Sequence, residues 1–358
     1  MQKYKILIID DSALMRRVVS DIINTDNRFM VADIAVDGVQ GLDFLIRNNG
    51  KYDVVLLDIN MPKMNGLDVL KRIKRYNLRC KVIIVSTLVK EGATETILAL
   101  EDGAIDFVLK PSDTNGRTVE EFRKRLIEAV AVATGSVKDE GNSRQKIITG
   151  KTSVTSKVIS GNDKIVAIAC STGGPKSLKE VMPMLPKNLN APVIIVQHMP
   201  AGFTKSLAER LNELSKIEVT EAKDGELLRK GHVYIAPGGY QLRIKNEKGC
   251  GHIVKITDEA PREGLKPCAN IMYESLSETA YDSAICVVLT GMGSDGTKGI
   301  EKLKQKKEVY VVSQDANTSI VYGMPRAIIN AGLADEVLPL DEVAQAIIKN
   351  VGVLNDGR

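Results

Sequence analysis

The chain has 358 residues, 44% of them hydrophobic and 26% charged, and its 49 basic and 45 acidic side chains leave a net charge of +4. This length and composition predict two globular domains and exclude a disordered or fibrous protein. The near balance of charge argues against nucleic acid as the main ligand. The start lacks the apolar core of a signal peptide and no apolar run reaches the length of a membrane span, so we expect a soluble, cytoplasmic protein without membrane insertion.

The cysteines and histidines narrow the chemistry. The five cysteines are odd in number and include no CxxC pair, so buried apolar roles are expected rather than disulfides or a metal site. Of the three histidines, His232 and His252 flank a predicted hairpin and are expected to be exposed. His198 is therefore the candidate for imidazole chemistry.

The first domain alternates strand and helix patterns. This alternation predicts a doubly wound parallel sheet with helices on both faces. Ligands of such sheets bind beyond the carboxyl ends of the strands. The expected strands are 6–9, 30–35, 54–57, 82–85 and 105–109.

Polar side chains follow four of these strands. They are Asp10 and Asp11 after the first strand, Asp58 after the third, Ser86 at the end of the fourth and Lys110 after the fifth. Three converging carboxylates would repel one another unless a cation lay among them, and such oxygen ligands suit Mg²⁺. A hydroxyl and an ammonium nearby suit a phosphoryl group as donor and counter-charge.

With these strand ends, residues 1–134 resemble the receiver domain of two-component response regulators, which has a flavodoxin-like fold. The resemblance implies that Asp58 is the phosphoacceptor and that Asp10, Asp11 and Asp58 hold Mg²⁺. It also implies that Ser86 and Lys110 respond to the phosphoryl group. Residues 135–162 change to Gly, Ser, Thr, Lys and Asn, which predicts a linker to a second domain over 163–358.

The second domain resumes the strand–helix alternation at Lys164. The pattern predicts a second, mainly parallel α/β domain with one antiparallel hairpin. The expected strands are 165–170, 193–197, 233–236, 284–290, 309–313 and 336–338, and the hairpin is formed by 241–244 and 252–256.

Three strand ends of this domain carry reactive side chains. Ser171 follows the first buried strand, His198 follows the second, and Asp295 lies in a glycine-rich turn after the 284–290 strand. Serine, imidazole and carboxylate at one sheet edge predict a nucleophile, its base and the group that orients the base. Ser171 or Thr172 is also expected to cap the next helix. Cys170 is the weaker candidate nucleophile, since it belongs to the buried run.

Two other interpretations remain open from the residues alone. Gly291–Gly296 fits G-x-G-x-x-G after a strand, with Asp315 about 20 residues further on, which is the dinucleotide-binding pattern. Against it, Asp295 would place a carboxylate where the pyrophosphate binds, and Ser171 and His198 would have no role. The alternative is a non-catalytic response-regulator scaffold, in which the three reactive side chains are coincidental.

The second half resembles the catalytic domain of the chemotaxis protein-glutamate methylesterases. The stretches that carry the resemblance are Ser171–Pro175, Val196–Pro200, Ala236–Gly239, Gly291–Gly296 and Tyr322–Pro325.

This resemblance implies hydrolysis of glutamate γ-methyl esters on methyl-accepting chemoreceptors by a Ser171–His198–Asp295 triad, without a cofactor for that step. It also implies deamidation of receptor glutamines by related chemistry, and regulation through phosphorylation by a chemotaxis histidine kinase. Backbone N–H groups near Thr172, after the nucleophile, or near Met292 are the expected oxyanion donors.

Overall fold

The structure is a computed structural model that describes residues 3–87, 90–111, 116–136, 161–247, 249 and 251–354. It divides into two compact units, residues 1–149 and 150–358. The boundary between the units lies within residues 137–160. The structure does not describe these residues, which make up most of the predicted linker 135–162. The domain limits 1–134 and 163–358 therefore stay predictions.

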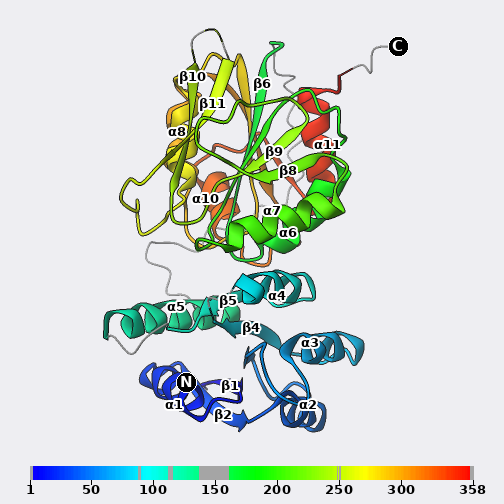
Figure 1. The fold of residues 1–358 in the computed structure, drawn as a ribbon, viewed down its shortest axis with the longest axis vertical. Helices are drawn as coiled ribbons and strands as arrows, with labels where there is room; N and C mark the ends of the chain where they lie inside the picture. The colour runs from blue at the N-terminus through cyan, green and yellow to red at the C-terminus, as the bar shows by residue number, and fades with distance from the viewer. Residues whose placement is uncertain are drawn as a thin grey trace. The chain divides into compact units, whose positions relative to one another are not determined.

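The first unit is a five-stranded parallel sheet in the order β2-β1-β3-β4-β5 (Figure 1). Its strands are β1 (Tyr4–Ile9), β2 (Phe29–Ala35), β3 (Val54–Leu57), β4 (Lys81–Ser86) and β5 (Asp106–Leu109). Its helices are α1 (Ala13–Thr25), α2 (Gly38–Arg47), α3 (Gly66–Arg75), α4 (Lys90–Glu101) and α5 (Gly116–Thr134). Each helix connects two strands that are consecutive in the chain or follows the last one, as the alternating pattern predicts.

The helices of the first unit cover both faces of its sheet. Ile6 and Ile8 of β1 belong to a core cluster with Val19 of α1 and Leu126 of α5. Ile9, whose side chain points to the opposite face, lies against α2. Because both faces are covered, the strands are continuous apolar runs, and polar side chains follow at their carboxyl ends.

The second unit is a seven-stranded sheet in the order β14-β13-β12-β6-β7-β9-β8, and every pairing in it is parallel. Its strands are β6 (Lys164–Cys170), β7 (Val193–Gln197), β8 (Glu218–Glu221), β9 (His232–Ile235), β12 (Ser283–Val288), β13 (Glu308–Gln314) and β14 (Glu336–Leu338). Its helices are α6 (Gly174–Val181), η1 (Met182–Met184), α7 (Phe203–Leu214), α8 (Ala269–Leu276), α9 (Thr297–Lys304), α10 (Met324–Asn330) and α11 (Leu340–Val351).

The predicted antiparallel hairpin is present as β10 (Gln241–Glu247) and β11 (Gly251–Thr257). It packs against α8, where the Ile244 N–H donates to Ser275 Oγ at 2.9 Å (Figure 1). The doubly wound, mainly parallel fold predicted for both halves is confirmed. Across the described ranges, no helix combines the length and the apolar character that a bilayer span requires.

The order of the strands places a switch point beside β6. From β6 the chain continues to β7 on one side, and it later returns to β12 on the other side. Open α/β sheets bind their ligands in the crevice at such a reversal, outside the carboxyl ends of the strands. The candidate site of the second unit is therefore expected beyond the carboxyl ends of β12, β6 and β7.

Candidate active site and phosphoacceptor site

The acidic cluster of the first unit lies at the carboxyl edge of its sheet. Asp10 and Asp58 are buried and Asp11 is exposed, and one ligand oxygen from each lies within 4.8 Å of the others. Lys110 Nζ contacts Asp10 Oδ2 at 2.8 Å and Asp58 Oδ2 at 2.7 Å. The structure thus brings together Asp10, Asp11, Asp58 and Lys110, which the sequence predicts at the ends of three strands.

Burial and electrostatics act against each other in this cluster. Burial raises the pKa of Asp58, and the Asp10 carboxylate adds to the rise, while the Lys110 ammonium offsets part of it. Burial would lower the pKa of Lys110, but the two carboxylates outweigh it and raise that pKa. A further positive charge would stabilise the ionised carboxylates. A set of carboxylate oxygens this close together fits Mg²⁺, which prefers hard oxygen ligands.

The hydroxyl predicted to respond to the phosphoryl group is at the end of the neighbouring strand. Ser86 is 1% exposed, and its Oγ donates to the Thr87 carbonyl at 3.4 Å. β4 pairs with β3, the strand that leads into Asp58, so Ser86 and Asp58 share one sheet edge. Arg16, which sequence reasoning missed, donates to the carbonyls of Asp10 and Asp11 at 2.9 and 2.8 Å.

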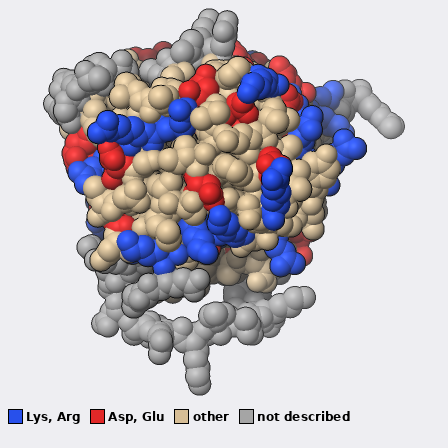
Figure 2. All heavy atoms as spheres, turned by 90° about the horizontal axis from the view of Figure 1, so that it is seen from below, with Lys and Arg blue, Asp and Glu red and all other residues tan. Residues whose placement is uncertain are grey.

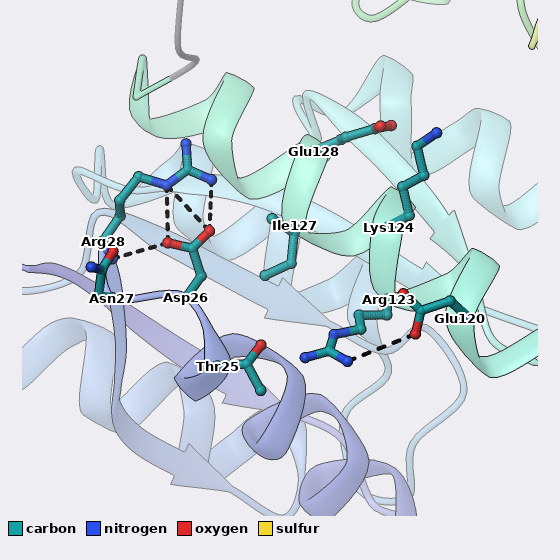
Figure 3. A pocket seen from close by; sticks show the side chains of 9 residues that line it. All are labelled: Thr25, Asp26, Asn27, Arg28, Glu120, Arg123, Lys124, Ile127 and Glu128. Carbon is teal, nitrogen blue, oxygen red and sulfur yellow. Dashed lines mark hydrogen bonds and ion pairs between the residues drawn. The ribbon is translucent and has the colours of Figure 1, made fainter. Parts of the chain in front are cut away.

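A separate hollow of about 630 Å³ lies on the first unit where the end of α1 faces α5 (Figure 3). Arg28 pairs with Asp26, and Arg123 pairs with Glu120. These pairs neutralise much of the charge that lines the hollow. It contains no residue of the acidic cluster, so it adds nothing to the phosphoacceptor chemistry.

The surface view shows how charge is distributed on one face of the molecule. In Figure 2, basic and acidic side chains are interspersed around a broad uncharged area. Nucleic-acid-binding surfaces instead gather basic side chains into a patch or stripe. The face drawn there does not have that pattern.

Ser171 directly follows β6 and is half-buried, with its backbone fixed on both sides. Its N–H donates to the Thr290 carbonyl at 3.0 Å, and its carbonyl accepts the Gly174 N–H at 2.8 Å. Since Ser171 N–H is already used, it is not free to stabilise an oxyanion. Gly291 lies against Ser171, because a Cβ at that position would be 2.8 Å from Ser171 Cβ.

The helix after Ser171 does not begin where the sequence predicted. α6 starts at Gly174, and its N-cap is Gly173 with a left-handed φ of 80° and no side-chain cap. Ser171 and Thr172 are therefore not its caps, and that expectation was wrong. The chain turns through Gly173 instead, which leaves the Ser171 hydroxyl without a capping role.

His198 follows β7, the strand that pairs with β6. Its N–H donates to the Cys170 carbonyl at 3.1 Å, so its backbone lies beside the start of the Ser171 turn. Its ring Nε2 contacts Asp295 Oδ2 at 2.8 Å. Among the described residues Ser171 Oγ makes no hydrogen bond to His198, so the structure joins two members of the predicted triad directly and places the third beside them. Because Nε2 of His198 contacts Asp295, Nδ1 is the ring nitrogen available to accept a proton from Ser171.

The Asp295 carboxylate is buried and surrounded by donors. The N–H groups of Ala269, Asn270 and Gly296 donate to it at 2.6, 2.9 and 2.9 Å, and Cys268 Sγ lies 3.2 Å from Oδ1. Burial alone would raise the pKa of Asp295, but the bond to His198 and the backbone donors lower it to about 2. Asp295 is thus an anion that can orient the imidazole. The same carboxylate occupies the turn where the dinucleotide alternative would place a pyrophosphate.

This lowered pKa predicts an acid-dependent stability. The folded-state pKa of Asp295 lies below the ordinary value of 3.8, so its contribution is present above about pH 4 and is lost as the pH falls through 2. A shift of roughly 2 units corresponds to about 2–3 kcal/mol. We expect urea titrations between pH 5 and pH 2 to show that the free energy of unfolding of the second unit falls more steeply in the wild type than in Asp295→Asn. Parallel pH dependences would contradict this, and Asp258→Asn, whose side chain is 83% exposed, serves as the control.

The two expected oxyanion positions lie beside Ser171. Thr172 follows Ser171 directly, and its carbonyl accepts Thr290 Oγ1 at 3.0 Å. Met292 follows Gly291 in the turn that packs on Ser171, and its side chain is exposed. Both positions stay predictions as oxyanion donors.

The other thiol and imidazole candidates are in structural positions. Cys170 is fully buried, which raises the pKa of its thiol and removes it as a nucleophile. The expectation that His232 and His252 are exposed was wrong, since they are 2% and 9% exposed. His232 stacks on Tyr234 and His252 on Tyr281, so each ring is buried by a tyrosine that sequence spacing did not reveal.

Sequence reasoning also missed the residue that ties the two strand ends together. Gln197 Nε2 donates to the carbonyls of Ser171 and His198 at 3.0 and 3.2 Å, and its Oε1 accepts Cys170 Sγ at 3.0 Å. A polar residue at the end of an otherwise apolar strand was the available signal. The buried carboxamide couples the backbone of Ser171 to that of His198.

Each half of the chain matches a known protein family. Residues 166–347 match the family model described as CheB methylesterase, and residues 6–119 match the response regulator receiver domain. A protein-glutamate methylesterase/protein-glutamine glutaminase of Halalkalibacterium halodurans is 42% identical over 97% of this chain and 98% of its own. One of Thermotoga maritima is 39% identical over 97% of this chain and 98% of its own.

A solved structure extends the similarity to three dimensions. The CheB methylesterase catalytic domain of Thermotoga maritima is 43% identical to the matching part of this chain, with a TM-score of 0.50. The match covers 53% of this chain and 99% of that domain.

Proposed function

Because the chain belongs to the CheB methylesterase family and carries a response regulator receiver domain, we propose that it hydrolyses glutamate γ-methyl esters of methyl-accepting chemoreceptors in chemotactic adaptation. The observation that carries the proposal is the contact of His198 with the buried Asp295 anion, beside the strand end that bears Ser171. Three neighbouring strands supply these residues at the switch point of the sheet.

The proposed reaction uses the side chains in sequence. Ser171 Oγ attacks the ester carbonyl while its proton passes to His198 Nδ1, since Nε2 is held by Asp295. The Asp295 carboxylate stabilises the imidazolium that forms. Backbone N–H groups at Thr172 or Met292 stabilise the oxyanion, and one such donor is commonly worth about 10²–10³ in rate.

The second half of the reaction returns the enzyme to its starting state. The imidazolium gives its proton to the leaving methoxide, so methanol departs and an acyl-serine remains. Water then attacks the acyl group while His198 takes one proton from it. The acyl–oxygen bond to Ser171 breaks, and Oγ takes back the proton from His198. The glutamic acid that forms loses its proton to solvent and becomes a carboxylate.

The same residues can act on a glutamine side chain. An amide replaces the ester, ammonia leaves instead of methanol, and the acyl-serine is identical. We include this deamidation in the proposal because the relatives are named for both activities.

The direct test is methanol release from receptor membranes that carry tritiated methyl groups. The full-length protein should release labelled methanol and leave free glutamate at the same positions. If no label is released, either without or with a small phosphodonor, the proposal is contradicted.

The receiver supplies the proposed regulation. Asp58 would accept a phosphoryl group from a chemotaxis histidine kinase, and Asp10, Asp11 and Asp58 would hold Mg²⁺. When bound, this ion neutralises negative charge on the phosphoryl oxygens. Lys110, now bonded to Asp58, would pair with the phosphoryl group, and Ser86 would donate its hydroxyl to it.

Asp58→Asn is expected to keep the basal esterase rate and to lose its activation by acetyl phosphate. The amide cannot form the acyl phosphate, whereas Ser171, His198 and Asp295 are unchanged. Methanol release with and without acetyl phosphate and Mg²⁺ measures both properties.

Asp53→Asn is the matched control. Asp53 is exposed and directly precedes β3, whereas Asp58 directly follows that strand. It should be activated as the wild type is. Equal activation of the wild type and Asp58→Asn would remove Asp58 from the switch.

A further inference from the structure

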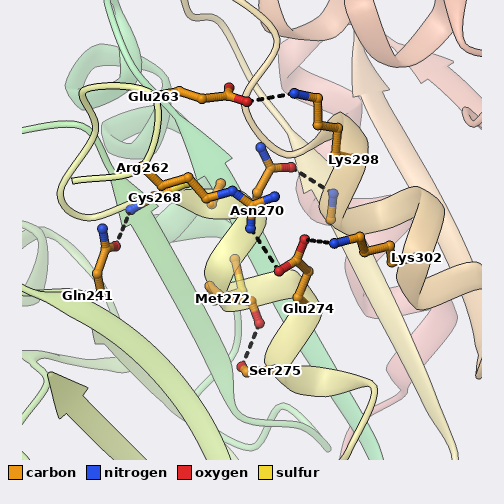
Figure 4. Close-up of polar contacts among 12 residues, drawn as sticks. Gln241, Arg262, Glu263, Cys268, Asn270, Met272, Glu274, Ser275, Lys298 and Lys302 are labelled. Carbon is orange, nitrogen blue, oxygen red and sulfur yellow. Dashed lines mark hydrogen bonds and ion pairs between the residues drawn. The ribbon is translucent and has the colours of Figure 1, made fainter. Parts of the chain in front are cut away.

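The first turns of α8 and α9 are capped by each other. The N-cap of α8, Cys268, makes no side-chain cap, and the N-cap of α9, Gly296, has no side chain to make one. The N–H groups of a first helical turn have no partner within their own helix. Asp295 accepts the N–H groups of Ala269 and Asn270 in α8. In return, Asn270 Oδ1 accepts the N–H groups of Gly296 and Gly299 at 3.1 and 2.7 Å. Figure 4 labels Asn270.

This reciprocal cap is buried and close-packed. Asn270 is 1% exposed and Asp295 is 3% exposed. A Cβ at Gly299 would lie 2.8 Å from Asn270 Cα, so the two helices meet there without room for a larger side chain. The Cys268 N–H at the start of α8 is held by Gln241 Oε1 at 2.9 Å, as Figure 4 also shows. The position of Asp295 therefore depends on where α8 begins.

We propose that Asn270 is a positioning residue for the hydrolysis, because its carboxamide oxygen fixes the turn that aims Asp295 at His198. Asn270 touches neither the nucleophile nor the imidazole and acts only through Asp295. It holds the residue that follows Asp295 and the first turn of α9. The inference rests on the proposed function.

The chain offers a control that separates positioning from simple helix packing. Glu274 of α8 contacts Lys302 Nζ of α9 at 2.8 Å (Figure 4). It also contacts Nη1 of Arg262, which precedes α8, at 2.8 Å. This ion-pair set also joins α8 to α9, but it has no contact with Asp295 or Gly296. Glu274→Gln therefore weakens the same helix pair without touching the reciprocal cap.

The experiment measures methanol release by the full-length Asn270→Ala and Glu274→Gln variants, at a temperature where thermal melts show each to be folded. Asn270→Ala should lower kcat by about 10- to 100-fold with KM within about twofold, since a misplacement of about 1 Å far from the chemistry can cost 10²-fold. Glu274→Gln should keep the wild-type kcat even if its Tm falls.

A pH profile adds a readout that a purely structural role would not move. A poorly aimed carboxylate stabilises the imidazolium less. The acidic limb of kcat/KM should therefore shift to lower pH in Asn270→Ala and stay in place in Glu274→Gln. If Asn270→Ala does not fold, Asn270→Ser, whose hydroxyl is too short to reach both N–H groups, takes its place with the same expectation.

Two results would overturn the inference. They are a wild-type kcat in Asn270→Ala and equal losses in Asn270→Ala and Glu274→Gln. Asp295→Asn separates this failure from failure of the proposed function. If Asp295→Asn releases methanol normally, the triad assignment fails and the inference fails with it. If Asp295→Asn is inactive while Asn270→Ala is normal, the inference alone fails.

Discussion

Replacing Ser171 by alanine is expected to lower kcat for methanol release by about 10⁴- to 10⁶-fold, the range found when the nucleophile of a serine enzyme is removed. The variant keeps the His198–Asp295 contact and the backbone bonds of residue 171, because these do not involve the hydroxyl. Its fold and its affinity for receptor membranes should therefore be unchanged. Tritiated methanol release under single-turnover conditions measures the loss.

Ser294→Ala is the matched control for this variant. Ser294 lies exposed in the same turn as Asp295, and its side chain has no role in the proposed chemistry. It should keep the wild-type rate. A serine-directed fluorophosphonate should label the wild type and Ser294→Ala but not Ser171→Ala. A wild-type rate in Ser171→Ala would remove Ser171 from the mechanism.

Gly174→Ala is expected to lower both stability and activity. A Cβ at Gly174 would lie 1.9 Å from Gln197 Oε1, so the carboxamide must move and its bonds to the Ser171 and His198 carbonyls must break. Overpacking costs about 1–3 kcal/mol, and each buried group left without a partner costs about 1–3 kcal/mol more. We expect a loss of about 3 kcal/mol in urea unfolding and a fall in kcat of at least about 10²-fold.

A double-mutant cycle isolates the cause of this effect. Gln197→Ala removes the group that the new methyl would strike, so Gly174→Ala should cost much less in that background. Gly174 has no positive φ, and alanine without a clash would even favour the helix. Equal costs in the two backgrounds would show that the clash with Gln197 is not the reason.

The sequence predicted the two sheets because their strands are buried on both faces. Residues 54–57 and 193–197 were predicted with the observed limits, since buried apolar runs mark such strands. β8 was missed because it is an edge strand, Glu218–Glu221, with only Val219 fully buried. An edge strand needs little apolar content, so its sequence resembles that of a loop.

The candidate site was predictable in part. Ser171, His198 and Asp295 follow strands, and the topology of a parallel sheet brings strand ends to one edge. Gln197 and Asn270 were not found, because their roles depend on backbone groups from segments far away in the chain. Side-chain bonds to main-chain atoms follow no spacing rule in a single sequence, although the polar Gln197 at the end of an apolar strand was one signal.

The central position of β6 in its sheet determines how late in synthesis the second unit can be completed. The ribosome releases the chain from its N-terminus, so β6 and β7 emerge well before β12, which pairs with the other edge of β6. Until residues 283–288 arrive, that edge is unpaired and the nascent chain lacks the carboxylate that follows. The receiver domain is complete long before this point. A chain that stops early would therefore contain the receiver domain but only part of the second sheet.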